Sequence, residues 1–100
     1  LAEAILAIIN NKDYQNEENS TEIYHYSNEG DISWYEFAKE VFKIERVECK
    51  VAPITTQQYP TLARRPNFST LNKRKIKKDF DIIKILSWKN SLKQCLIRII

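Results

Sequence analysis

The sequence predicts an α/β fold in which a small sheet of two or three strands packs with about four helices. The first observation is that apolar residues recur at helical spacing near both ends of the chain and after residue 33. The second is that short runs of β-branched and aromatic residues, bounded by turn residues, separate these stretches. With 100 residues, of which 43% are hydrophobic, the chain can support one modest core and a single domain, residues 1–100.

A first helix is expected over residues 1–9. Its apolar stripe consists of Leu1, Ile5, Ile8 and Ile9. No capping residue precedes it, which suggests that the chain starts inside a larger protein. Polar residues 12–22 are then expected to form a surface loop.

Three segments have the composition of strands: residues 23–27, 49–54 and 68–71. A turn over residues 28–31 follows the first of them, with Gly30 expected at a left-handed position.

The remaining helices carry start signals. Ser33 and Glu36 form a capping box, and Thr55 with Gln58 repeats that pattern for one short turn. Asn72 is expected to cap a basic helix, and Ser87 to cap the last helix. The basic helix should bury Ile76 and Phe80, and Cys95 and Ile99 should also face inward from the last helix. The second and last helices should share a core of Trp34, Phe37, Val41, Phe42, Trp88, Leu92 and Leu96.

Charge is divided unevenly along the chain. Residues 1–50 carry 5 Lys/Arg and 11 Asp/Glu, a net charge of −6, whereas residues 51–100 carry 11 and 2, a net charge of +9. The basic half suits nucleic acid, a phosphorylated small molecule or the chain's own acidic half. We expect folding to bring part of the acidic half close to the basic half.

Composition excludes several classes of protein. One glycine cannot build a glycine-rich phosphate loop, which needs at least two. Cys49, Cys95 and the single histidine, His25, do not make a structural zinc site or a disulfide framework, and a reducing cytoplasm is expected. No apolar run approaches the length of a membrane span, so no membrane partner is expected.

Tyr35 and Lys39 match the Y-x-x-x-K pair with which short-chain dehydrogenases pass a proton to a carbonyl. We reject this pair as an active site, because a core helix explains both residues and no nucleotide fold accompanies them. Glu29 and Asp31 are explained by the turn, and His25 by an exposed strand position. No catalytic residue is therefore assigned.

Arg64-Arg65-Pro66 is the local motif whose residue types favour binding of a phosphate group. A guanidinium matches phosphate oxygens with a planar fork, and the proline stiffens the backbone that carries it. The alternative is that both arginines pair with the acidic half. The lysines of residues 73–78 point in several directions and are expected to form a solvated face.

The order of several motifs resembles one family. Residues 23–30 (IYHYSNEG) and 33–38 (SWYEFA) are similar to a passage of the dTDP-4-dehydrorhamnose reductases, members of the extended short-chain dehydrogenase/reductase group. Residues 53–56 (PITT), 59–61 (YPT) and 63–66 (ARRP) resemble a later passage, and the spacing of Lys75, Phe80, Trp88 and Leu92 resembles its end. The resemblance covers the last third of such an enzyme.

This resemblance implies the C-terminal, dTDP-sugar-binding part of an extended short-chain reductase fold. The intact enzyme would reduce dTDP-4-dehydro-L-rhamnose to dTDP-L-rhamnose, with NADPH bound by an N-terminal domain that is missing here. Arg65, and secondly Arg64, would contact the nucleotide diphosphate. No metal ligand is expected, because Arg98 lies where some members carry acidic residues between subunits. A homodimer of the intact enzyme is left open.

Two alternatives remain at this stage: a small basic nucleic-acid-binding domain, and a non-catalytic regulatory relative of the reductase. Against the first, the aromatic residues occupy helix core positions and do not alternate with the arginines. The second depends on residues that precede Leu1.

Overall fold

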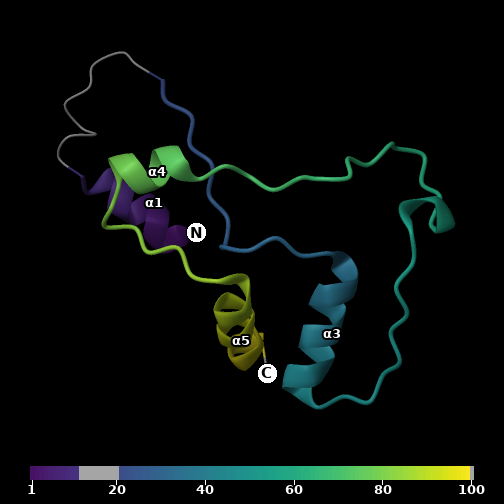
Figure 1. Ribbon diagram of the computed structural model, residues 1–100. Helices are drawn as coiled ribbons and strands as arrows, with labels where there is room; N and C mark the ends of the chain where they lie inside the picture. Colours follow the sequence, from purple (N-terminus) through teal and green to yellow (C-terminus); the bar gives the residue numbers. More distant parts are fainter. Residues whose placement is uncertain (12–20, 100) are drawn as a thin grey trace. The chain divides into compact units, whose positions relative to one another are not determined.

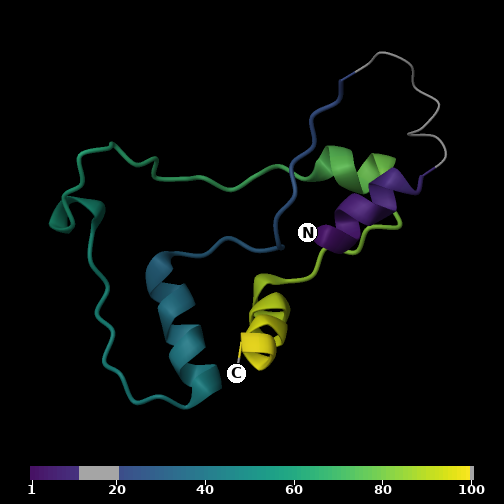
Figure 2. The same cartoon turned by 180° about the vertical axis from the view of Figure 1, so that it is seen from behind.

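The computed structural model describes residues 1–11 and 21–99 (Figures 1 and 2). Its elements are α1 (Ala2–Ile9), α3 (Trp34–Glu45), the 3-10 helix η1 (Thr56–Gln58), α4 (Arg74–Asp79) and α5 (Trp88–Ile99). They belong to two compact units, one comprising Leu1–Glu29 with Leu71–Leu86 and the other Gly30–Thr70 with Ser87–Ile100. None of the helices in the described ranges is long and apolar enough to cross a membrane.

The predicted sheet is wrong. The described ranges contain helices and irregular chain but no strand, so the fold seen here is helical rather than α/β. Residues 23–27, 49–54 and 68–71 all lie outside helices. The predicted loop over residues 12–22 lies mostly outside the described residues.

Segment 22–29 shows why β-like composition did not produce a strand. A strand requires a neighbouring backbone that exchanges N–H and C=O groups with it. In this segment two backbone carbonyls accept hydrogen bonds from lysine side chains instead of from a neighbouring backbone. Lys75 Nζ donates to the carbonyl of Ile23 at 3.1 Å, and Lys73 Nζ donates to that of Asn28 at 2.8 Å. Composition favoured the extended backbone, but it could not supply a pairing partner.

The first unit has its core under α4. Ile76 and Phe80 are buried, as predicted, and the ring of Tyr24 meets that of Phe80 edge-on with centroids 5.3 Å apart. In α1 the buried residue is Ala4, whereas Leu1 and Ile5 of the predicted stripe are exposed. The helix was correctly predicted, but its inward face was not.

In the second unit, α3 begins at the predicted capping box. Ser33 N donates to Glu36 Oε2 at 2.8 Å, and Glu36 N donates to Ser33 Oγ at 3.2 Å. The same pattern begins η1, where Thr55 N donates to Gln58 Oε1 at 2.7 Å. Both helix starts are therefore fixed by local sequence.

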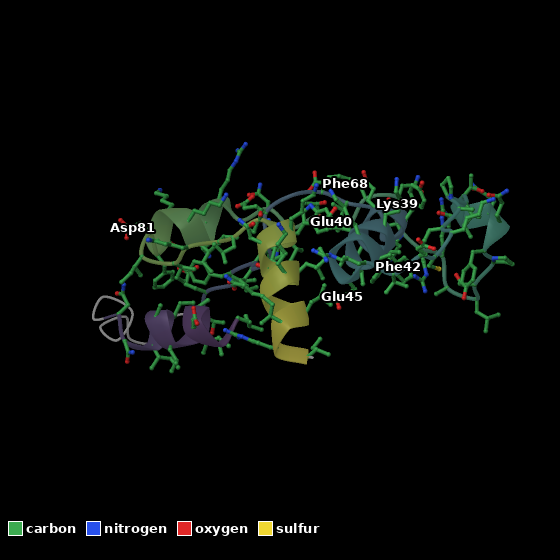
Figure 3. The ribbon with its side chains drawn as sticks, turned by 90° about the horizontal axis from the view of Figure 1, so that it is seen from below. Lys39, Glu40, Phe42, Glu45, Phe68 and Asp81 are labelled. Carbon is green, nitrogen blue, oxygen red and sulfur yellow. The ribbon has the colours of Figure 1, made fainter. Side chains whose placement is uncertain are left out.

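Helices α3 and α5 pack against each other in this unit. The rings of Phe37 and Trp88 lie 6.5 Å apart, and Leu92 is buried. Glu40, labelled on α3 in Figure 3, forms an ion pair with Lys89 of α5, with 3.9 Å between Oε2 and Nζ.

The predicted shared core is only partly correct. Trp34 is 79% exposed at the first turn of α3, where its ring meets Phe37 edge-on. Cys95 and Ile99 of α5 are also exposed, contrary to prediction. Two short helices that touch along one face bury only the side chains at that contact. Helical spacing marks more positions than these as apolar, so some of the apolar positions stay exposed.

Gly30 has the predicted positive φ, +105°. A Cβ built at this position would lie 2.6 Å from Cδ1 of Trp88, in the same unit. Both the backbone conformation and the indole therefore require glycine here.

Candidate functional site

Arg64 and Arg65 lie on a long irregular segment of the second unit. We call residues 52–70 the arm; every residue in it is exposed, and η1 is its helical element (Figure 1). A hydrogen bond from Thr61 Oγ1 to the carbonyl of Ala63, 2.8 Å long, bends the chain just before the arginines. Pro66 then restricts the backbone that follows.

The two guanidinium groups are exposed, and neither takes part in an ion pair within the described ranges. The acidic half pairs with lysines instead, so the alternative role foreseen for Arg64 and Arg65 has no support in that part of the chain. Adjacent exposed arginines on a proline-stiffened segment can present bidentate donors to an anion such as a diphosphate.

A second polar cluster surrounds Lys73, whose role sequence reasoning missed. The residue is only 7% exposed, and its Nζ contacts Ser27 Oγ at 3.3 Å, the Asn28 carbonyl at 2.8 Å and Glu29 Oε2 at 3.8 Å. The prediction of a solvated lysine face is wrong at this position. The missed signal is its spacing, because Lys73 precedes the buried Ile76 by three residues and so lies on the same helical face.

The neighbouring lysines extend this cluster along segment 22–29. Lys77 forms an ion pair with Glu29, and Lys75 forms one with Glu22. A hydrogen bond from Lys77, opposed by some desolvation and supported by the charge of Lys73, holds the pKa of Glu29 below its ordinary value. Because these ammonium groups already have partners, the cluster holds segment 22–29 against α4 and does not present a free anion site.

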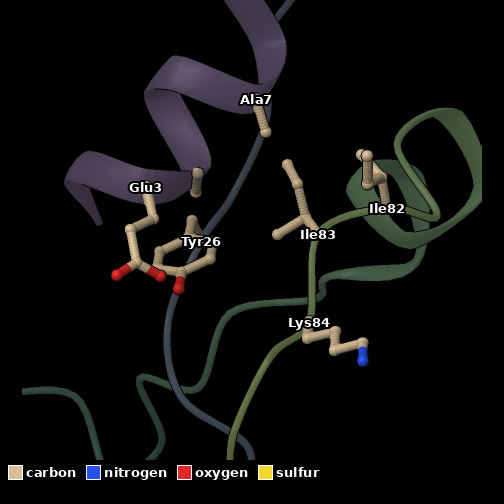
Figure 4. Close-up of a pocket in the computed structure, with 7 residues that line it drawn as sticks. Glu3, Ala7, Tyr26, Ile82, Ile83 and Lys84 are labelled. Atoms are coloured by element: carbon tan, nitrogen blue, oxygen red, sulfur yellow. The ribbon is translucent and has the colours of Figure 1, made fainter.

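A small cavity opens between α1 and the segment after α4 (Figure 4). It has a volume of about 220 Å³ and is lined by Glu3, Ala4, Ala7, Tyr26, Ile82, Ile83 and Lys84. Tyr26 belongs to the motif of residues 23–30, but neither Arg64 nor Arg65, the predicted substrate-binding residues, lines the cavity.

The rejected catalytic pair behaves as a surface feature. Lys39 Nζ lies 5.2 Å from the centroid of the Tyr35 ring, a cation–π contact between neighbours one turn apart on α3. His25 is exposed. In residues 1–11 and 21–99 no group of His, Cys, Asp and Glu side chains is arranged to hold a metal ion.

The residues present do not fit a dinucleotide cofactor. Such cofactors bind where glycines let the backbone approach a pyrophosphate. The single glycine, Gly30, has the indole of Trp88 against the face where a Cβ would project. The space beside this glycine is therefore filled by the protein's own side chain.

Comparison with known proteins adds to this geometry. The family described as the RmlD substrate binding domain matches residues 1–100. A dTDP-4-dehydrorhamnose reductase of Aggregatibacter actinomycetemcomitans is 42% identical over 71% of this chain and 26% of its own length. The corresponding reductase of Escherichia coli (strain K12) is 32% identical over 74% of this chain and 26% of its own.

The spore coat polysaccharide biosynthesis protein SpsK of Bacillus subtilis (strain 168) is 35% identical over 74% of this chain and 25% of its own length. No solved structure matches significantly. The chain thus spans about a quarter of the length of these curated relatives. Because the family match extends over all 100 residues and includes the exposed arginine segment, this chain belongs to the RmlD substrate-binding domain family.

Proposed function

We propose that this chain is the dTDP-sugar-binding part of a dTDP-4-dehydrorhamnose reductase. The intact protein would reduce dTDP-4-dehydro-L-rhamnose to dTDP-L-rhamnose, a sugar donor for surface polysaccharides. The observation that carries the proposal is the exposed Arg64-Arg65-Pro66 segment in a chain matched throughout by a substrate-binding domain family. The names of the reductase relatives supply the substrate class.

Arg65 is the residue proposed to contact the diphosphate, and Arg64 is proposed to assist. Pro66 restricts the backbone next to Arg65, so less conformational freedom is lost when the guanidinium is fixed on a ligand. The two arginines have no ion-pair partner in the described ranges, which leaves their donors available.

The nicotinamide cofactor is assigned to a part of the reductase outside these residues, with NADPH as the proposed form. The assignment of the cofactor to another part of the reductase agrees with the indole of Trp88 against the single glycine, Gly30. The chain by itself is accordingly expected to have no reductase activity. Cys49 and Cys95 are free thiols, which fits the cytoplasm as the proposed location.

The test uses the intact reductase and steady-state kinetics. Arg65→Ala should raise the KM for the dTDP-sugar by about 10- to 150-fold, corresponding to about 1.5–3 kcal/mol for a charge-assisted hydrogen bond. The KM of Arg65→Lys for the dTDP-sugar should lie between those of wild type and Arg65→Ala, because lysine keeps the positive charge but lacks the planar pair of guanidinium donors. The KM for NADPH should not change.

Arg98→Ala is the matched control, since Arg98 is also an exposed arginine of the second unit. It should leave the KM for the dTDP-sugar at the wild-type value. If Arg65→Ala has no larger effect than this control, Arg65 has no role in binding the diphosphate. An intact protein that binds dTDP-sugar but never oxidises NADPH would instead be a regulatory relative.

A further inference from the structure

The arm exposes large apolar side chains along its whole length. Ile54, Tyr59 and Phe68 are exposed by 60%, 66% and 71%, and Leu62 is fully exposed. Each side chain presents apolar surface, and removal of that surface from water would be favourable. Phe68 is labelled in Figure 3. These four side chains lie within 15 consecutive residues and give the arm apolar surface that a partner could cover.

Local hydrogen bonds give the arm its shape without burying it. Gln58 N donates to the carbonyl of Thr55 at 3.1 Å, Tyr59 N to that of Thr56 at 3.2 Å, and Thr61 Oγ1 to that of Ala63. Each bond joins residues two or three positions apart. The turns are therefore formed before the apolar side chains find a partner, which reduces the entropy lost on docking.

Two of these apolar side chains flank the arginine pair in the sequence. Leu62 precedes Arg64 by two residues, and Phe68 follows Arg65 by three. An extended backbone covers at most about 20 Å over this span, so contacts at its two ends would restrict the arginine pair between them.

We propose that the arm docks, through Leu62 and Phe68, onto the nicotinamide-binding part of the same polypeptide. This inference rests on the proposed function, under which that part exists. The curated relatives are about four times as long as the stretch this chain matches, so most of such a polypeptide lies outside the residues described here. A covalently linked surface is also present at a higher effective concentration than a second copy.

The proposal is tested by thiol labelling of the intact reductase without ligands. Cys49 and Cys95 are exposed and are first replaced by serine. Leu62→Cys and Phe68→Cys are then introduced singly, and each labelling rate is divided by the rate in urea. Both positions should label at least about tenfold more slowly than Lys93→Cys, an exposed control position on α5.

Labelling of Leu62→Cys and Phe68→Cys at the rate of Lys93→Cys would overturn the proposal. Protection that disappears over about a hundredfold dilution would also overturn it, because a second copy would then cover the arm. Concentration-independent protection supports docking within one polypeptide. Since no dTDP-sugar is present, this result does not depend on whether Arg65 binds a diphosphate.

Discussion

Lys73 shows that a lysine within a basic stretch of sequence can be buried. A lysine in a basic stretch is expected to be solvated, because burying an ammonium group is costly unless it is paired. Here Ser27 Oγ, the Asn28 carbonyl and Glu29 surround the ammonium group. These partners make burial possible, and they attach the turn before Gly30 to the start of α4.

Lys73→Met should destabilise the chain by about 1–3 kcal/mol, because it removes the hydrogen bonds from Lys73 Nζ to the Asn28 carbonyl and to Ser27 Oγ and the ion pair with Glu29. Met keeps the length of the side chain, so the loss would come from polar contacts rather than from a cavity. Urea unfolding followed by tryptophan fluorescence measures the change. Lys78→Met is the control, since Lys78 is exposed on the same helix, and it should change stability by no more than about 0.5 kcal/mol. Equal effects of the two substitutions would show that the Lys73 contacts do not stabilise the fold.

At the scale of elements, the helix starts were the most predictable features. Ser33 and Glu36 satisfy each other's backbone N–H groups, and Ser87 Oγ accepts from Asn90 N at 3.3 Å at the start of α5. The basic helix differs slightly: Asn72 Oδ1 does accept from Arg74 N at 3.0 Å, but Lys73 is the residue at the cap position. Such contacts lie within three residues, so sequence alone can specify them.

Ser33→Ala should lower the free energy of unfolding by about 0.5–2 kcal/mol, because α3 loses its N-cap acceptor. Ser69→Ala in the arm removes the same hydroxyl from an exposed position outside the helices and should have almost no effect. Thermal unfolding followed by circular dichroism compares the two variants. Matching melting temperatures for both would mean that the capping box contributes nothing to stability.

At the scale of the whole molecule, folding pairs some acidic residues of the first half of the chain with lysines of the second half. Glu22 and Glu29 pair with lysines of the 73–77 stretch in the first unit, and Glu40 pairs with Lys89 in the second. The predicted approach of the acidic half to the basic half is confirmed for these residues. Four lysines that would otherwise attract nucleic acid, Lys73, Lys75, Lys77 and Lys89, therefore have carboxylate partners, which weakens the nucleic-acid alternative.

Acid should destabilise the molecule partly through Glu29. The Lys77 hydrogen bond lowers the pKa of Glu29 in the folded state. The stability that Glu29 contributes is therefore complete above the ordinary glutamate pKa of about 4.3, and it is lost as the pH falls through the lower pKa of the folded state. In Glu29→Gln the loss of stability between about pH 6 and about pH 3 should be smaller. Some dependence should remain, because hydrogen bonds from Ser33 also lower the pKa of Glu36. Glu48→Gln, an exposed control, should keep the wild-type pH profile; if Glu29→Gln keeps it too, the ion pairs of Glu29 do not contribute.

The sequence by itself determined the features that depend on neighbouring residues. The helix positions, the two capping boxes, the positive φ of Gly30 and the burial of Ile76 and Phe80 follow from contacts within a turn or two. The arginine segment was also singled out from its residue types; the structure shows that it is exposed, and its contact with a diphosphate stays a prediction.

Only the tertiary structure decided which surfaces are covered. Residues 23–27 have the composition of a strand, but no strand forms there. The carbonyls of Ile23 and of the adjacent Asn28 accept hydrogen bonds from lysine side chains. Helical spacing marked Trp34 and Cys95 as core, yet the contact between α3 and α5 leaves both exposed, while Lys73 became buried. The physical reason is that burial and strand pairing depend on partners distant in sequence, which local spacing does not encode.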